Sequence, residues 1–240
     1  EIAQIAQAAE NKFFGKPCGL LDQMTSSVGS FVEIDFADPA KPVIEKVNFD
    51  FASCGYALCI VDTGGSHSDL TDEYAAVRKE MESVAAYLGK SVLREVDESE
   101  FMKNIADIRS SCGDRAVLRA MHFYGDNARV KKQAAALRAG DFKTFMKYII
   151  ESGRSSYMYN QNVYSCKKAA EQPVSLALSL SEKLLDGCGA WRVHGGGFAG
   201  TIQAFVPLNK LDEYKDLMER VFGSGSCYVL SVRPVGGVEL

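Results

Sequence analysis

The sequence predicts an α+β fold in which most helices come before a short group of strands at the C-terminal end. The first observation is a change of hydrophobic period, from alternating or continuous apolar runs near the N-terminus to helical spacing from residue 69 onward. The second is the order of the last fifth of the chain, which reads strand, glycine-rich break, strand, helix, strand. The third is a composition of 47% hydrophobic and 24% charged residues, which is ordinary for a globular protein. A length of 240 residues allows one large domain or two smaller ones and buries an ample core.

The first quarter of the chain predicts two short helices and three strands. Apolar residues at helical spacing share one face of residues 2–13, and Gly15 with Pro17 ends that helix. A second helix over residues 23–28 ends at Gly29. The strands follow from alternation or from continuous apolar character, and they cover residues 31–37, 43–49 and 56–62.

Helical periodicity dominates the middle of the chain. The predicted helices cover residues 69–88, 100–108, 115–138, 142–153 and 174–185. Gly125 is expected to weaken the long helix, and Gly153 to end the next one. Residues 157–172 show no clear period and predict a loop with part of a helix. The closing elements are strands at 190–194, 201–206 and 227–233, with a helix at 211–221 between the last two.

Charge and cysteine content exclude several classes of protein. The net charge of −4 disfavours a nucleic acid or an anionic membrane as the main partner. No apolar run approaches the roughly 18 residues of a spanning helix, and no basic-then-apolar leader opens the sequence. The seven cysteines are odd in number and form no C-x-x-C pair, so neither a disulfide framework nor a zinc ribbon is indicated. They predict reduced thiols in a cytoplasmic protein.

Asp22 is the only charged residue of residues 17–29. It follows a bend that Gly15, Pro17 and Gly19 can make, and it falls in or just before the first turn of the second predicted helix. Backbone N–H groups and the helix dipole favour a charged carboxylate at that place. Two interpretations remain open from the residues alone: Asp22 caps the helix, which is the commoner role, or it accepts a proton from a substrate hydroxyl.

The run from Gly195 to Gly200 is a glycine-rich bend between two predicted strands. Such a backbone either approaches a ligand closely and points N–H groups at an anion, or simply makes a tight turn. Tyr74 lies on the apolar face of its predicted helix, where periodicity favours a core aromatic. A tyrosine can also bury its ring while presenting its hydroxyl to a pocket.

The remaining candidate groups predict no site. His67 and Asp69 are two residues apart, but two ligands without a third favour loop or capping roles, so no metal site is predicted. His122 and His194 have no acidic partner close in the sequence and receive no role. Residues 223–226 precede a strand rather than a helix, so they predict a turn and not a phosphate loop.

Residues 10–23, with their Cys18-Gly19-x-x-Asp22-Gln23 core, resemble the second motif of galactokinases in the GHMP kinase superfamily. The resemblance implies that Asp22 is the catalytic base and that Gly19 approaches the sugar through its backbone. Residues 72–78 resemble the galactokinase segment whose tyrosine hydrogen-bonds the sugar, which implies that role for Tyr74.

Residues 192–206 resemble the third galactokinase motif, whose glycine loop lies beside the substrate and the nucleotide phosphates. The implied residues on the phosphate side are Gly195, Gly196, Gly197 and Gly200. Two residues depart from the pattern, since Ala199 replaces a glycine and His194 stands where the family usually has threonine.

The resemblance covers nearly all of the chain but only the second half of the family pattern. Neither the early Gly-Glu-His-x-Asp sugar motif nor the Ser-rich phosphate loop occurs in the sequence, which begins at Glu1. Residues 160–165 also lack the acidic Asp-x-Glu-Val-Ser segment that the family often has. The expectation is therefore the C-terminal part of a galactokinase-like protein. Residues 1–53 would be a remnant of the N-terminal GHMP kinase domain, and residues 54–240 the C-terminal domain, built of helices and an antiparallel, ferredoxin-like sheet.

The function that the resemblance implies is ATP-dependent phosphorylation of the anomeric hydroxyl of galactose or a related sugar. ATP and Mg²⁺ are the implied cofactors, with their main ligands outside this chain, so the isolated chain is expected to be inactive. The first three strands are expected to lack sheet partners, which predicts a monomer or weak self-association through exposed edges. The alternative is a galactokinase-like sugar sensor that binds ligand and a regulatory protein without turnover. The Cys18-Gly19-x-x-Asp22-Gln23 core disfavours a mevalonate or homoserine kinase relative.

Overall fold

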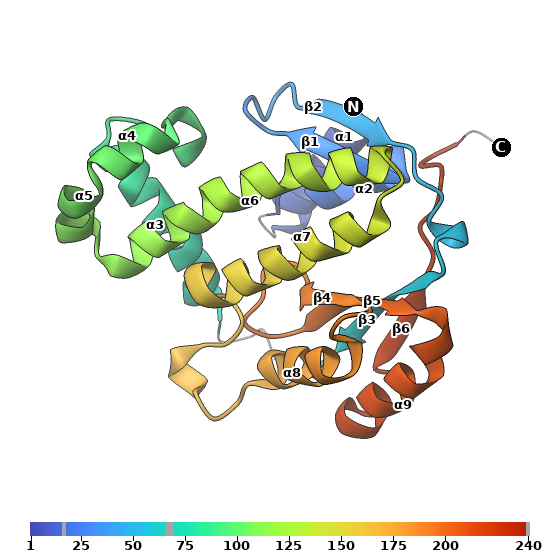
Figure 1. The fold of residues 1–240 in the computed structure, drawn as a ribbon. Coiled ribbons are helices and arrows are strands. Elements are labelled where there is room, and N and C mark those ends of the chain that lie inside the picture. The colour runs from blue at the N-terminus through green and yellow to red at the C-terminus, as the bar shows by residue number, and fades with distance from the viewer. Residues whose placement is uncertain (16–17, 66–69, 239–240) are drawn as a thin grey trace.

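The computed structural model describes residues 1–15, 18–65 and 70–238, and it combines helices with two antiparallel sheets, as predicted for an α+β fold (Figure 1). The strands are β1 Phe31–Asp35, β2 Val43–Val47, β3 Tyr56–Asp62, β4 Ala190–Val193, β5 Thr201–Pro207 and β6 Cys227–Leu230. The helices are α1 Ile2–Ala8, α2 Leu21–Val28, α3 Thr71–Tyr87, α4 Glu98–Lys103, α5 Ile105–Cys112, α6 Asp114–Arg138, α7 Phe142–Ser155, α8 Pro173–Leu185 and α9 Leu211–Phe222.

The four-stranded sheet has the order β4-β5-β3-β6, and every neighbouring pair is antiparallel. Along the chain, β3 is followed by helices, then by β4, β5, α9 and β6, which is the ferredoxin-like β-α-β-β-α-β arrangement. Because β3 pairs with β5 on one side and with β6 on the other, the prediction that it lacks sheet partners is wrong. Strands β1 and β2 pair with each other in a separate two-stranded sheet.

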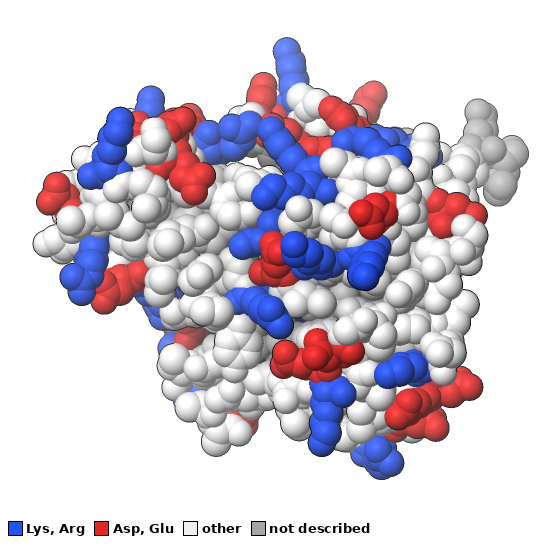
Figure 2. All heavy atoms as spheres, viewed as in Figure 1, with Lys and Arg blue, Asp and Glu red and all other residues white. Residues whose placement is uncertain are grey.

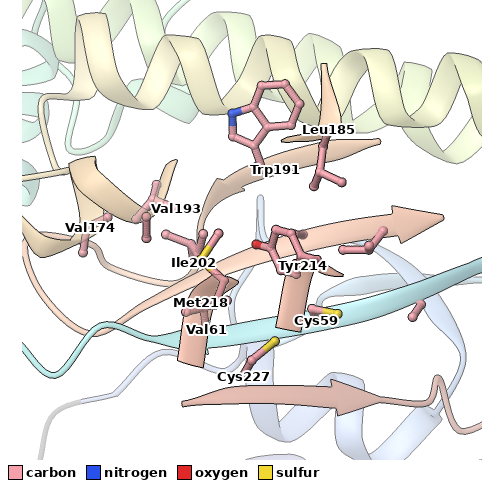
Figure 3. Close-up of a cluster of buried hydrophobic side chains, with 14 of the residues drawn as sticks. Cys59, Val61, Val174, Leu185, Trp191, Val193, Ile202, Tyr214, Met218 and Cys227 are labelled. Atoms are coloured by element: carbon pink, nitrogen blue, oxygen red, sulfur yellow. The ribbon is translucent and has the colours of Figure 1, made fainter. Parts of the chain in front are cut away.

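Both faces of the four-stranded sheet are covered by helices. In Figure 1, α6 and α7 cross one face, whereas α8 and α9 cover the other. The alternation of side chains along a strand explains the two layers, because Cys59 and Val61 point to the α8–α9 side while Leu58 packs on the α7 side. On the α8–α9 side, Tyr214 and Met218 of α9 are fully buried against the sheet (Figure 3).

The aromatic core on the α7 side joins the sheet to the N-terminal segment. Phe142 of α7 packs edge-to-face on Phe205 of β5, with ring centroids 5.7 Å apart, and on Phe51, at 5.8 Å. Arg138 at the end of α6 adds ion pairs to Glu33 of β1 at 3.0 Å and to Glu45 of β2 at 2.7 Å. The two-stranded sheet is therefore held against α6 and α7.

The first helix differs from its prediction. It covers Ile2–Ala8 and continues as a π-helical turn, Ala9–Phe14, which ends at Gly15 with a φ of +78°. Ala3 is buried, but Ile2, Ile5 and Phe13 of the predicted apolar face are exposed, Phe13 by 89%. Pro17, the other predicted helix terminator, lies outside the described residues.

Two helix boundaries also differ from the predictions. Residues 100–108 were predicted as one helix, but the chain breaks at Asn104, which ends α4 and precedes α5. Helix α7 runs through Gly153 to Ser155. Glycine stands at position 153 because the helix packs closely on β4 there: an added Cβ would lie 2.9 Å from the Cβ of Arg192. Strand β6 ends at Leu230, before the predicted Arg233, whose carbonyl instead accepts a hydrogen bond from the N–H of Ser30 at 2.7 Å.

The surface carries no extended field of one sign in the view of Figure 2, where basic and acidic side chains intermingle. This distribution agrees with the small net charge of −4. None of the helices in the described part of the chain combines the length and apolar character needed to cross a membrane.

Candidate functional site

Asp22 lies in the first turn of α2 and its side chain is exposed. The helix begins after Leu20, and no side chain makes a capping hydrogen bond there. The capping interpretation of Asp22 therefore finds no support in the structure. The carboxylate lies at the positive end of the helix dipole. Leu21, Thr25 and Phe31 line a shallow cavity of about 380 Å³ beside it.

His194 directly follows β4 and precedes the glycine-rich bend. Partial loss of hydration lowers the pKa of His194, the negative charge of Asp22 acts in the opposite direction, and the charge of Arg192 lowers it further. The ring Nδ1 lies 3.0 Å from Thr201 Oγ1, and the His194 N–H donates to the Thr201 carbonyl at 3.0 Å. These contacts with the first residue of β5 fix the imidazole at the entrance of the bend.

Gly195 to Gly200, which we call the glycine loop, connects β4 to β5. Gly195, Gly197 and Gly200 have φ values of +70°, +82° and +88°, so the backbone uses the left-handed region that glycine tolerates. Gly195 and Gly196 are exposed, and within the described part of the chain no hydrogen bond uses their N–H groups. Unpaired backbone N–H groups in such a bend are suitable donors to an anion.

Tyr74 of α3 contacts the glycine loop directly. Its hydroxyl donates a hydrogen bond to the Gly197 carbonyl at 2.7 Å, and its ring meets that of Phe198 edge-to-face at 5.3 Å. An added Cβ on Gly196 would lie 2.7 Å from the tyrosine ring, so the loop can pass this closely only as glycine. Burial raises the pKa of Tyr74, so the hydroxyl stays protonated and able to donate. The structure therefore shows Tyr74 packed against the glycine loop, and contact of its hydroxyl with a ligand stays a prediction.

Gly19 lies in the bend before α2. The bend is held by Asn11, whose side-chain Oδ1 accepts from the Cys18 N–H at 2.7 Å, and by Gln7, which donates to the Cys18 carbonyl at 3.2 Å. An added Cβ on Gly19 would meet no atom within 4 Å, so the space beside this backbone is open. No hydrogen bond within the described ranges joins Gly19 or Asp22 to Tyr74.

Sequence reasoning missed two residues that hold the glycine loop. The Asn162 carbonyl accepts from the Phe198 N–H at 2.5 Å, and its Nδ2 donates to the Gly196 carbonyl at 3.1 Å. Thr63, just after β3, donates from its N–H and from its hydroxyl to the Gly200 carbonyl, at 2.9 Å and 2.6 Å. Both contacts span many residues, and residues 157–172 show no period that would have indicated them.

A buried polar cluster lies behind β4, and it corrects the prediction for His122. Asp126, one helical turn further along α6, lies 3.5 Å from His122 Nε2, so an acidic partner close in the sequence does exist. His122 Nδ1 lies 2.9 Å from Ser155 Oγ. Both His122 and Ser155 are buried, which closes this Ser-His-Asp set to a substrate. Arg192 of β4 donates to Ser152 at 2.7 Å, and Ser152 in turn donates to Asp126 at 2.8 Å, so the cluster supports the strand that leads to His194.

The described residues contain no group of three or more His, Cys, Asp and Glu side chains that could hold a metal ion. His67 and Asp69, considered above as ligands, lie outside the described residues. The donors that fit a nucleotide are the unpaired N–H groups of Gly195 and Gly196, which suit a phosphate and not a metal.

Comparison with known proteins finds galactokinases. No family model matches the chain. The chain is 31% identical to the galactokinase of Homo sapiens over 229 residues, which cover 95% of this chain and 55% of the human protein. It is 33% identical to the galactokinase of Bos taurus over 228 residues, covering 95% of the chain and 55% of that protein. A galactokinase of Actinobacillus pleuropneumoniae is 28% identical over 218 residues, covering 91% of the chain and 54% of that protein. The chain thus spans about half the length of these curated relatives.

Solved structures agree on the fold. The structure of Lactococcus lactis galactokinase complexed with galactose matches with a TM-score of 0.72 at 23% identity, over 99% of this chain and 60% of that chain. L. major mevalonate kinase in complex with R-mevalonate matches with a TM-score of 0.58 at 13% identity, over 98% and 58% of the two chains.

Proposed function

We propose, from the premise that this chain is a galactokinase homologue with the fold of the GHMP kinases, that it forms the base-bearing part of an ATP-dependent sugar 1-kinase. The reaction would move the γ-phosphoryl group of ATP to the anomeric hydroxyl of galactose or a related sugar. One observation carries the proposal. The carboxylate of Asp22 is exposed in the first turn of α2 and caps no helix, and the glycine loop offers N–H groups that no hydrogen bond of the described residues uses.

Asp22, Gly19 and Tyr74 are assigned to the sugar side of the site. Asp22 accepts the proton of the attacking hydroxyl or fixes its orientation. The open backbone at Gly19 and the hydroxyl of Tyr74, which also donates to the Gly197 carbonyl, place the sugar.

The glycine loop lines the phosphate side, through the N–H groups of Gly195 and Gly196 and the tight backbone at Gly197 and Gly200. When bound, ATP supplies the phosphoryl group and Mg²⁺ neutralises its charge. Within the described residues no metal cluster exists, so the chain's own contribution is the base, the sugar contacts and backbone N–H donors.

We also propose a domain boundary near residue 53. The paired strands β1 and β2 form a sheet of their own, while β3 begins the ferredoxin-like unit that closes with β6. Residues 1–53 then belong to an N-terminal GHMP kinase domain and residues 54–240 to the C-terminal one. All seven cysteines are free thiols, which supports a cytoplasmic setting.

A coupled ADP-release assay with galactose and Mg-ATP tests the proposal. It compares the 240-residue chain with a longer protein that joins this chain to a segment homologous to the part of galactokinases that it does not match. We expect sugar-dependent turnover from the longer protein only, because phosphoryl transfer also depends on a metal site, which the described residues do not contain, and on the Ser-rich phosphate loop, which does not occur in the sequence.

Three other outcomes have definite meanings. Comparable turnover by the 240-residue chain would overturn the assignment of the phosphate site. Galactose binding without turnover in the longer protein would identify a sugar sensor. Neither binding nor turnover would overturn the proposed function.

A further inference from the structure

Asn162 contacts the glycine loop on both sides of Gly197. Its carbonyl accepts from the Phe198 N–H at 2.5 Å, and its side-chain Nδ2 donates to the Gly196 carbonyl at 3.1 Å. The residue is only 5% exposed, so these bonds are shielded from water. A hydrogen bond that water cannot replace is costly to lose, because the buried partner is left unpaired.

The loop backbone at this place is strained and tightly packed. Gly197 and Phe198 have φ values of +82° and +59°, and for a residue with a Cβ this region is unfavourable. An added Cβ on Gly197 would lie 1.8 Å from the Asn162 carbonyl oxygen. The contact with Asn162 therefore requires glycine at 197 and offsets the unfavourable conformation of Phe198.

The side chains of Asn162 and Tyr74 together fix two carbonyls of the glycine loop. The side chain of Asn162 donates a hydrogen bond to the Gly196 carbonyl, and the hydroxyl of Tyr74 in α3 donates one to the Gly197 carbonyl at 2.7 Å. Because a trans peptide is planar, a fixed Gly196 carbonyl also fixes the N–H of Gly197 and the Cα atoms of Gly196 and Gly197. The exposed residues Gly195 and Gly196 are thereby anchored where their segment enters the buried part of the loop.

We propose that Asn162 is a positioning residue for the phosphate side of the site: its side-chain amide holds the Gly196 carbonyl and so anchors Gly196 and limits the backbone rotation that would turn the N–H groups of Gly195 and Gly196 away from a phosphate. This inference rests on the proposed function and deepens it. It requires an amide, since a carboxylate in the same place cannot donate to a carbonyl.

The test uses the ¹⁵N-labelled 240-residue chain and follows the amide signals of Gly195 and Gly196 by NMR. Inorganic pyrophosphate is the probe for the phosphate side, and galactose is titrated separately. Asn162→Ala removes the donor without adding charge, and Asn162→Asp keeps the size but removes the donor. Asn160→Ala is the matched control, because Asn160 is buried in the same segment and no hydrogen bond in the described structure joins its side chain to the glycine loop.

We expect pyrophosphate affinity to fall about three- to tenfold in both Asn162 variants, the size of one lost neutral hydrogen bond, and less than twofold in Asn160→Ala. Without ligand, the amide signals of Gly195 and Gly196 should shift in the Asn162 variants and not in the control. A merely structural role would lower the melting temperature and leave pyrophosphate affinity unchanged.

Each contrary result is distinct. If the wild-type chain binds pyrophosphate and Asn162→Ala binds it equally well, the inference is wrong and the proposed function stands. If only Asn162→Asp weakens binding, the cause is its charge, and the inference is again wrong. If pyrophosphate moves neither amide signal in the wild-type chain, the phosphate-side assignment fails together with the inference, while the galactose titration still tests the sugar side. Should Asn162→Ala fail to fold, the near-isosteric Asn162→Asp with added salt, which screens its charge, decides the same question.

Discussion

Gly125 and Gly153 both lie inside helices, and the structure predicts opposite effects when each is replaced by alanine. In a helix interior, glycine is about 1 kcal/mol less favourable than alanine, so the intrinsic gain is the same at both sites. The surroundings differ. At Gly125 of α6, the three atoms nearest to an added Cβ all belong to the guanidinium of Arg129, the first at 3.2 Å, which is the far end of a flexible side chain. Gly125→Ala should therefore increase the unfolding free energy by about 0.5–1 kcal/mol.

At Gly153 of α7 the added methyl meets strand β4. It would lie 2.9 Å from the Cβ of Arg192 and 3.1 Å from the Trp191 carbonyl oxygen, neither of which can rotate away. Overpacking of this kind costs about 1–3 kcal/mol, which exceeds the intrinsic gain. Gly153→Ala should therefore lower the unfolding free energy by about 1 kcal/mol.

Urea unfolding of the two variants, followed by circular dichroism, measures both effects. For a chain of this size a change of 1 kcal/mol corresponds to roughly 2–4 °C in Tm, so thermal melting gives a second reading. If Gly153→Ala stabilised the protein as much as Gly125→Ala does, the argument that Gly153 is required for the close approach of α7 to β4 would be refuted.

Two further predictions concern the hydroxyl of Tyr74 and the pH dependence of stability. Tyr74→Phe keeps the ring packed but removes the hydroxyl and its hydrogen bond to Gly197, so galactose affinity should fall by roughly 0.5–1.5 kcal/mol, with a loss of unfolding free energy of about the same size; calorimetric titration showing normal affinity alongside a lower Tm would assign Tyr74 to packing alone. Burial lowers the pKa of His122 in the folded state below its usual 6.5, so the unfolded chain binds a proton first and stability should decrease as the pH falls below 6.5. Protonation of His122 in the unfolded chain lowers the unfolding free energy by up to about 1.4 kcal/mol per pH unit. In urea titrations, the unfolding free energy of His122→Gln should therefore fall less between pH 7.5 and about 5.5 than that of the unmodified chain. An equal dependence on pH in the variant would contradict His122 as its origin.

Most of the strands and helices were predictable because their apolar residues recur with the period of the element. The antiparallel sheet places Cys59 and Val61 on one face, as their alternation requires. The failures have particular causes. Gly153 was taken as a helix terminator, although close packing against β4 explains it better. Ile5 and Phe13 do share a helical spacing, yet both are exposed in the structure.

Only part of the candidate site could be predicted from the sequence. The identity of Asp22, Tyr74 and the glycine loop came from resemblance to a family, since local physics favoured a cap, a core aromatic or a simple turn. The contact between Tyr74 and Gly197 spans 123 positions, and no local pattern encodes it. Asn162 lies in a segment without period, so only the folded chain shows that it reaches the glycine loop. The partner of His122, by contrast, was within reach, because Asp126 lies at i+4 on the same helix.

The most direct measurement of the central claim is the turnover of Asp22→Asn in the longer protein. The substitution keeps the shape of the side chain and removes the base. The ADP-release rate at saturating galactose and Mg-ATP should fall by about 10²–10⁴, the usual size of a general-base contribution, while galactose affinity changes little. Turnover close to that of the unmodified protein would contradict the account, because Asp22 would then be an exposed residue at a helix start with no part in the chemistry.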